Sequence, residues 1–219
     1  MFGRGEKVKF VGDIYDSNIF ITENNKKHLI VDAGASVDKL AGGVNKGDVV
    51  GLLLTHGHFD HSYFALDYAK EFNIKIYASD KIKEYLSELK KNYSTDFDIK
   101  PLEVKDFSNF IFLNSNGEVE IEGVKVKFFQ MGGHSKSDMC FLIGDDLYVG
   151  DLIIGRGIGR MDLYGGNRQD MLQSLKALEK LEYKTMHCGH GEDLSKEMAD
   201  KVIKTYIKFL SRTNGESKK

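Results

Sequence analysis

The hydrophobic positions in the first half of the chain form short runs, which predict a meander of strands followed by alternating strands and helices. Apolar runs separated by polar turns are typical of strands. The apolar spacing of Ile82, Leu86 and Leu89 is typical of an amphipathic helix. The expected strands are 8–14, 18–22, 28–32, 49–55 and 74–78, and the expected helices are 62–71 and 79–91.

The second half repeats this pattern with a hairpin, further strands and two helices. Residues 118–122 and 124–130 alternate in polarity around Gly123, as the two strands of a hairpin do. Asp170 is expected to cap a helix. The other expected strands are 139–143, 147–149 and 184–187, and the expected helices are 170–181 and 195–210. Segment 91–109, which has no clear period, is expected to be a loop with a short strand around 102–104.

Two halves that each run from strands to helices predict an α+β fold, in which two packed sheets carry helices on their outer faces. We expect one domain over residues 1–212 and a frayed polar tail over residues 213–219. The polar motifs follow predicted strands. Because strand ends in layered folds border clefts, these motifs are expected to share one site.

Composition narrows the classes of function. The formal charge of −2 from 31 basic and 33 acidic residues argues against a nucleic-acid partner. Two cysteines cannot form a disulfide framework, and a reducing cytoplasm is therefore the expected location. The longest apolar stretch is far below the ~20 residues that span a bilayer, so no membrane partner is expected.

The strongest chemical signal is a dense cluster of metal-ligand groups directly after the apolar run at 49–55. Residues 55–61 read Thr-His-Gly-His-Phe-Asp-His, which places His56, His58, Asp60 and His61 together. Such a cluster is expected by chance on the order of once in a thousand such chains. Four such groups exceed what one tetrahedral ion can use beside a water molecule, so the motif predicts two metal ions.

Two ions need further ligands, and three residues at predicted strand ends can supply them. His134, Asp151 and His190 each stand beside a glycine, where the backbone can approach an ion closely. A single histidine in such a place is more often a hydrogen-bonded core or surface residue. Together with the first cluster, the three residues favour a shared metal centre.

The order of these motifs resembles the metallo-beta-lactamase-fold hydrolases, and the likeness extends from Val31–Gly34 to His190. The resemblance implies a four-layer αββα sandwich with the metal centre at one edge of the two sheets. It also implies two divalent ions, with zinc expected and iron or manganese as alternatives. The first ion is expected at His56, His58 and His134 and the second at Asp60, His61 and His190; Asp151 is expected to bridge them and Asp32 to orient a ligand imidazole.

The third motif departs from this family pattern. Many members read Gly-His-Thr-Pro-Gly, whereas this chain has Ser135, Lys136, Ser137 and Asp138 after His134. The ligand is kept and the proline turn is lost. Either Lys136 or Asp138 faces the pocket, or the segment is a surface turn, which is the interpretation we prefer at this stage.

A narrower resemblance, to small single-domain glyoxalase II-like hydrolases, is carried by residues 155–167. Arg160 lies where two-domain members carry a basic residue that contacts the peptide portion of the thioester substrate. It is therefore a candidate carboxylate anchor, with a loop salt bridge to Asp162 as the alternative. Tyr164 is a second candidate for the pocket, with core packing as its alternative. Two-domain members use a C-terminal helical region to hold glutathione; we expect no counterpart of it here, and therefore the resemblance does not extend to specificity for glutathione.

These features predict a metal-dependent hydrolase of a small thioester substrate, acting as a monomer or small homo-oligomer. A hydroxide held between two ions and Asp151 would attack the carbonyl, while Asp60 orients or moves a proton. A mononuclear-iron persulfide dioxygenase, using His56, His134 and Asp151, is the alternative. A lactonase and a non-catalytic metal-binding module are weaker alternatives.

Overall fold

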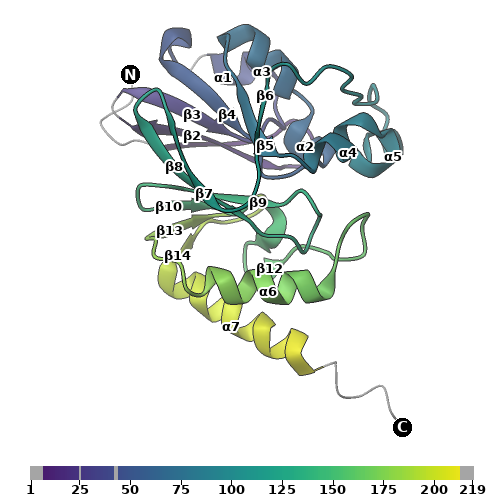
Figure 1. The fold of residues 1–219 in the computed structure, drawn as a ribbon, viewed down its shortest axis with the longest axis vertical. Coiled ribbons are helices and arrows are strands. Elements are labelled where there is room, and N and C mark those ends of the chain that lie inside the picture. The colour runs from purple at the N-terminus through teal and green to yellow at the C-terminus, as the bar shows by residue number, and fades with distance from the viewer. Residues whose placement is uncertain (1–6, 25, 42–43, 213–219) are drawn as a thin grey trace.

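Two six-stranded sheets stacked face to face form the centre of the molecule (Figure 1). The computed structural model describes residues 7–24, 26–41 and 44–212. The first sheet contains, in order, β1 (Lys7–Val11), β2 (Asn18–Asn24), β3 (Lys27–Val31), β4 (Val49–Leu53), β5 (Ile76–Ser79) and β6 (Phe110–Leu113). The second contains β14 (Leu194–Ser195), β13 (Thr185–His187), β10 (Asp146–Tyr148), β9 (Met139–Ile143), β8 (Val124–Gln130) and β7 (Gly117–Ile121).

Both sheets are mixed. In the first, β1, β2 and β3 are antiparallel, while β3, β4, β5 and β6 run parallel. In the second, β10 and β13 are parallel and the other pairs are antiparallel. A short ribbon of β11 (Ile153–Ile154) and β12 (Gly157–Ile158) lies apart from them.

Helices cover the outer face of each sheet, which confirms the predicted αββα layers (Figure 1). The helices are α1 (Val37–Ala41), α2 (Phe59–Ser62), α3 (Ala65–Phe72), α4 (Ile82–Ser87), α5 (Leu89–Asn92), α6 (Arg168–Leu178) and α7 (Lys196–Arg212). The 3-10 turns are η1 (Lys46–Asp48), η2 (Ser94–Asp96) and η3 (Gly150–Leu152). Helices α1, α3 and α4 pack on the first sheet, and α6 and α7 pack on the second.

The first sheet is buried on both faces, because successive side chains along its central strands are apolar and point to opposite sides. On β2, Ile19 and Ile21 face the helices, whereas Phe20 faces the second sheet. On β4, Leu52 likewise faces the helices, and Leu53 faces the second sheet. Successive strand residues point to opposite faces, so a strand with apolar groups on both faces must lie between two layers.

Several expected elements differ in the structure. The strand expected around 102–104 is absent, and β6 forms instead at Phe110–Leu113. The helix expected at 79–91 is divided into α4 and α5, because Glu88 between them is extended. Helix α6 begins after Asn167, whose side chain accepts the Asp170 backbone N–H, so Asp170 is not the cap.

The ligand motifs lie where strands end, at one edge shared by the two sheets. The tail predicted at 213–219 lies outside the described residues. Within 7–24, 26–41 and 44–212, no helix has both the length and the apolar character needed to cross a bilayer.

Candidate metal centre

The segment after β4 brings four ligand-type side chains to the sheet edge. His56 and His58 follow the strand, and Asp60 and His61 lie in α2, which begins at Phe59. His56, His58 and His61 are buried, whereas Asp60 is half-buried. Because β4 is fixed between its neighbours, the segment that follows it has little freedom to move.

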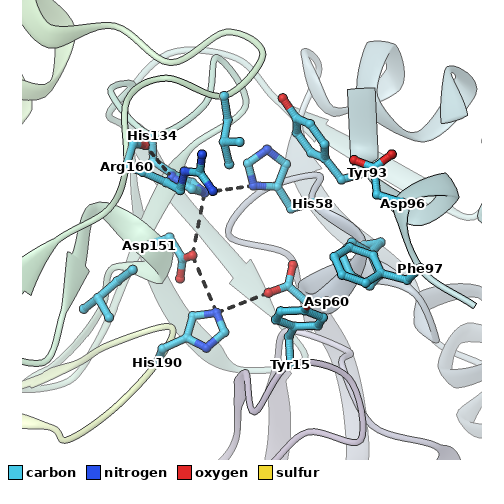
Figure 2. A pocket seen from close by; sticks show the side chains of 13 residues that line it. Tyr15, His58, Asp60, Tyr93, Asp96, Phe97, His134, Asp151, Arg160 and His190 are labelled. Carbon is cyan, nitrogen blue, oxygen red and sulfur yellow. Dashed lines mark hydrogen bonds and ion pairs between the residues drawn. The ribbon is translucent and has the colours of Figure 1, made fainter. Parts of the chain in front are cut away.

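The second sheet supplies three further side chains at its own strand ends. His134 lies in the loop between β8 and β9, and its Nε2 is 2.8 Å from Nδ1 of His58. His190 lies in the loop after β13, and its Nε2 is 3.2 Å from Oδ2 of Asp60 (Figure 2). Residues more than 70 positions apart in sequence thus meet in two pairs across the edge.

Asp151, in η3 after β10, lies between these pairs. Its Oδ2 is 3.6 Å from Nε2 of both His134 and His190, and its Oδ1 is 3.3 Å from Nε2 of His61. Figure 2 shows its carboxylate pointing between His134 and His190. One carboxylate therefore faces both halves of the site.

The ligand atoms form three compact groups, each with its atoms within 4.8 Å of one another. The groups are His56, His58 and His134; Asp60, His61 and His190; and His56, His61 and Asp151. The first two are the sets expected from the sequence for two separate ions. The structure thus brings all seven expected ligands into one site.

Asp32 holds His61 from behind. Its Oδ2 accepts a hydrogen bond from His61 Nδ1 at 2.8 Å, and its Oδ1 accepts the Thr55 backbone N–H at 2.8 Å. Asp32 is buried, and its backbone adopts the left-handed conformation, with φ of 62°. With Nδ1–H bonded to the carboxylate, Nε2 is the nitrogen of His61 that faces the site and is available to a metal ion.

The third motif is a buried network and not a surface turn, which corrects the preferred interpretation for Asp138. The Asp138 carboxylate is buried and accepts the backbone N–H groups of His134 and Ser135, at 2.9 and 2.8 Å. Lys136 is exposed, but its backbone N–H donates to the Tyr85 hydroxyl at 2.9 Å. These bonds fix the loop that carries His134 without a proline.

Burial and neighbouring charges set the protonation of the ligands. Burial lowers the pKa of His58 to about 3, and it lowers the pKa of His56 well below its usual range. These imidazoles are neutral at pH 7. Burial alone would raise the pKa of Asp151, but the nearby His61 lowers it well below the usual range. Burial acts to lower the pKa of His61, but the carboxylates of Asp60, Asp151 and Asp32 raise it well above the usual value, so this imidazole must release a proton when a metal binds.

The donor set fits divalent metal ions. Nε2 of His56 is buried and has no hydrogen-bond partner within the described part of the chain. Pairs of imidazole nitrogens also face each other, at 2.8 Å between His134 and His58 and at 3.2 Å between His61 and His190. A cation satisfies such converging electron pairs, and imidazole with carboxylate suits zinc or iron.

A cavity of about 410 Å³ opens beside the ligands. Its lining includes aromatic and apolar side chains that the sequence did not identify as part of the site, namely Tyr15, Phe59, Tyr93, Phe97, Ile154 and Leu163. Tyr93 and Phe97 lie in the aperiodic segment 91–109, and Tyr15 lies in a turn. The aromatic residues in these loops were the one feature of the sequence that could have indicated this part of the cavity wall.

Of the two residues expected to contact the substrate, Arg160 lines the cavity and Tyr164 does not. The guanidinium of Arg160 makes two bonds to Asp162, at 2.9 and 2.7 Å, while the Arg160 carbonyl accepts His134 Nδ1–H at 2.9 Å. The hydroxyl of Tyr164 donates to Glu84 at 2.5 Å and the Tyr164 ring contacts Tyr85.

Both cysteines are buried free thiols. Burial raises the pKa of Cys188 to about 12, so this thiol is protonated at neutral pH and has no part in the site chemistry.

Comparison with known proteins places this geometry in context. A family model described as the metallo-beta-lactamase superfamily matches residues 12–190. The probable metallo-hydrolase YqgX of Bacillus subtilis is 30% identical over 190 residues, which covers 84% of this chain and 88% of that protein. The hydroxyacylglutathione hydrolase GloC of Haemophilus influenzae is 25% identical over 161 residues, with coverage of 71% and 75%.

Among solved structures, the BLEG-1 B3 metallo-beta-lactamase superposes with a TM-score of 0.80 at 24% identity. The match covers 88% of this chain and 95% of that one. With this coverage and TM-score, the two chains share a fold.

Proposed function

This chain is a metallo-hydrolase of the metallo-beta-lactamase superfamily, and from that premise we propose that it cleaves thioesters with two divalent ions bound. The observation that carries the proposal is the position of Asp151. Its carboxylate faces His61, His134 and His190 at 3.3 to 3.6 Å and so connects two complete ligand sets. A centre for one ion would leave the other ligand set without a role.

The three compact ligand groups support one set of residues for each ion, and zinc is the metal that we expect. His56, His58 and His134 would hold one ion, Asp60, His61 and His190 the other, and Asp151 would contact both. Bound divalent ions supply Lewis acidity toward a carbonyl oxygen and lower the pKa of water toward about 7.

The chain's own groups position the reactants. Asp60 lines the cavity, with its Oδ2 3.2 Å from Nε2 of His190, and its carboxylate can accept a proton from water and pass it to the departing thiolate. The Asp32 carboxylate and the Arg160 carbonyl fix the proton on the Nδ1 atoms of His61 and His134. Water adds across the acyl–sulfur bond, and a carboxylic acid and a thiol are released.

Two features support a thioester as the substrate. GloC is named a hydroxyacylglutathione hydrolase, and such a substrate is a thioester. Residues 155–167, which resemble the corresponding stretch of glyoxalase II-like enzymes, lie over the site, with Arg160 at the cavity wall. We therefore favour hydrolysis of a small S-acyl thiol.

Release of free thiol from S-lactoylglutathione and from a neutral S-acyl thiol tests the proposal. We expect His58→Ala to lower kcat/KM by more than about 100-fold, because a ligand should matter at least as much as the groups that orient it. His28→Gln, a histidine on β3 outside the site, is the matched control and should keep the activity. Wild-type hydrolysis by His58→Ala would contradict the proposal. One iron ion per chain with oxygen uptake on persulfides would favour the dioxygenase instead.

A further inference from the structure

Three aromatic rings from separate segments form a continuous surface beside the metal centre. We call this surface, made by Tyr15, Phe59 and Phe97, the aromatic shelf. The rings of Phe59 and Phe97 stack with centroids 4.6 Å apart, and the Tyr15 ring lies edge-on to Phe97 at 4.5 Å. Tyr15 comes from the β1–β2 turn, Phe59 from α2 and Phe97 from the residue after η2.

The shelf faces the same cavity as the ligands. All three rings line it together with Asp60 and His190. Figure 2 shows Tyr15 and Phe97 on the side of Asp60, across the cavity from His134 and Arg160. A group attached to a carbonyl at the metal centre can therefore reach these rings.

The outermost ring of the shelf remains exposed. Tyr15 is 63% exposed, one of few large hydrophobic side chains among the described residues that are not substantially covered. An open aromatic surface at the mouth of a cavity is typical of a binding site.

The backbone conformation at Tyr15 is also unfavourable for its side chain. Tyr15 and Asp16 are both left-handed, with φ of 53° and 51°. Glycine adopts this conformation freely, whereas a bulky residue does so at a cost and is often found at a functional site. Tyr93, beside His58 in the same cavity, is left-handed too, with φ of 65°.

The charges around the cavity argue against a negatively charged group on the shelf. The charges of Asp60 and Asp151 would be offset by the bound ions, whereas Asp96, which is not among the expected ligands, adds a further carboxylate to the lining beside Phe97. Arg160 is the one Lys or Arg among the described lining residues, and its guanidinium is paired with Asp162. An uncharged apolar group matches this surface better than a small hydroxyacyl group, which would leave the rings uncovered.

We propose that the substrate carries an aromatic or similarly bulky apolar acyl group, which packs on Tyr15, Phe59 and Phe97 while its carbonyl lies at the metal centre. The inference rests on the proposed function for the reaction itself. It adds the chemical class of the acyl group, an arylacyl or branched apolar chain on a thiol.

The kinetic test compares acetyl and phenylacetyl thioesters of one neutral thiol, N-acetylcysteamine. We expect kcat/KM to be about 10- to 100-fold higher for the phenylacetyl ester, because an added ring fills an apolar pocket. Phe97→Ala should lower this preference at least about tenfold. Tyr15→Asn, which suits a left-handed backbone but lacks the ring, should act in the same direction. Phe209→Ala, an exposed phenylalanine on α7, is the control and should keep the preference.

A binding measurement separates this inference from the proposed function. Calorimetric titration with phenylacetate and with acetate measures binding to the aromatic shelf without any turnover. We expect phenylacetate to bind at least about tenfold more tightly, and Phe97→Ala to remove the difference. Tight phenylacetate binding without hydrolysis of either ester would support the shelf and overturn the thioester function. Hydrolysis of both esters at equal kcat/KM, with equal binding of the two acids, would overturn the shelf.

Discussion

Asp32 controls which nitrogen of His61 faces the metal centre. Its carboxylate accepts from His61 Nδ1 at 2.8 Å and also from Thr55, so both oxygens are committed. A carboxylate at this position favours the tautomer with hydrogen on Nδ1 and leaves Nε2 free to bind an ion. The left-handed backbone at Asp32 therefore holds one side chain in the orientation that the ligand needs.

Replacing Asp32 with Asn should weaken metal binding without changing the size of the side chain. Asn tolerates the left-handed backbone, but its amide would direct a donor toward His61 and favour the wrong tautomer. We expect zinc affinity, measured by calorimetric titration, to fall about 10- to 100-fold. Asp98→Asn, at an exposed aspartate, serves as the control. Wild-type affinity in Asp32→Asn would refute the orienting role.

The sequence predicts the ligands at this scale because their chemistry is local. His56, His58, Asp60 and His61 lie in one short motif, and metal binding restricts which residue types can stand there. The residues next to Asp138 in the sequence do not show whether its side chain is buried. Whether its carboxylate faces water or two buried N–H groups depends on how the whole loop packs.

At the scale of elements, the loop that carries His190 is closed by a contact between His187 at its start and Asp193 at its end, and His187 is also tied to Asp146 on the neighbouring strand β10. Nδ1 of His187 lies 2.9 Å from Asp193 and Nε2 of His187 lies 3.0 Å from Asp146. Both ring nitrogens must donate, so the charged imidazolium fits this position. Lys9 also pairs with Asp193, at 3.2 Å, and Asn18 donates to the Gly191 carbonyl at 3.0 Å.

This arrangement predicts a pH-dependent contribution to stability. Burial acts to lower the pKa of His187, but its bonds to Asp146 and Asp193 outweigh burial and raise the pKa above the usual value of about 6.5. A raised pKa in the folded state stabilises the protein fully below about pH 6.5, and the effect is lost as pH rises through the raised value.

Urea unfolding of metal-stripped wild type and His187→Gln from pH 5.5 to 9 measures this contribution. The wild type should be more stable by about 1.5–3 kcal/mol at the acidic end, because charge-assisted hydrogen bonds are lost in the variant. The difference should shrink as pH rises. A difference that is constant, or that grows with pH, would rule out the charged state of His187.

Close approach of the β13 loop to η3 makes Gly189 a sensitive position. A Cβ there would overlap Oδ1 of Asp151 and would lie 2.9 Å from Cε1 of His61. We expect Gly189→Ala to displace both ligands, to lower stability by about 1–3 kcal/mol and to reduce bound metal. At Gly47, in η1, an added Cβ meets nothing within 4 Å, so Gly47→Ala is the matched control. Equal metal content in the two variants would contradict the tight packing described.

The sequence predicts the helices and strands whose apolar residues recur with a regular period, but it does not predict the wall of the cavity. The hairpin around Gly123 and helix α6 follow their apolar periods. The segment 91–109 has no period, because Tyr93 and Phe97 face the cavity from irregular backbone. The strand β6 that follows is ordered by pairing with β5, a long-range contact that no local pattern encodes.

At the scale of the molecule, the two sheets supply different parts of one site. Strand β4 of the first sheet precedes His56, His58, Asp60 and His61, and the second sheet supplies His134, Asp151 and His190 at its strand ends. The site therefore exists only when the sheets are stacked in register. Metal bound across this edge contacts both sheets and should stabilise the folded state, since binding to the folded form alone shifts unfolding.

Whether two ions drive thioester hydrolysis is tested by the rate of hydrolysis as zinc is added back to metal-stripped protein, with bound metal measured in the same samples. We expect activity to rise with occupancy and to level off at about two ions per chain, the number used by a bridged two-metal site. Full activity at one ion per chain, or hydrolysis that persists in the stripped protein, would contradict the role of two ions.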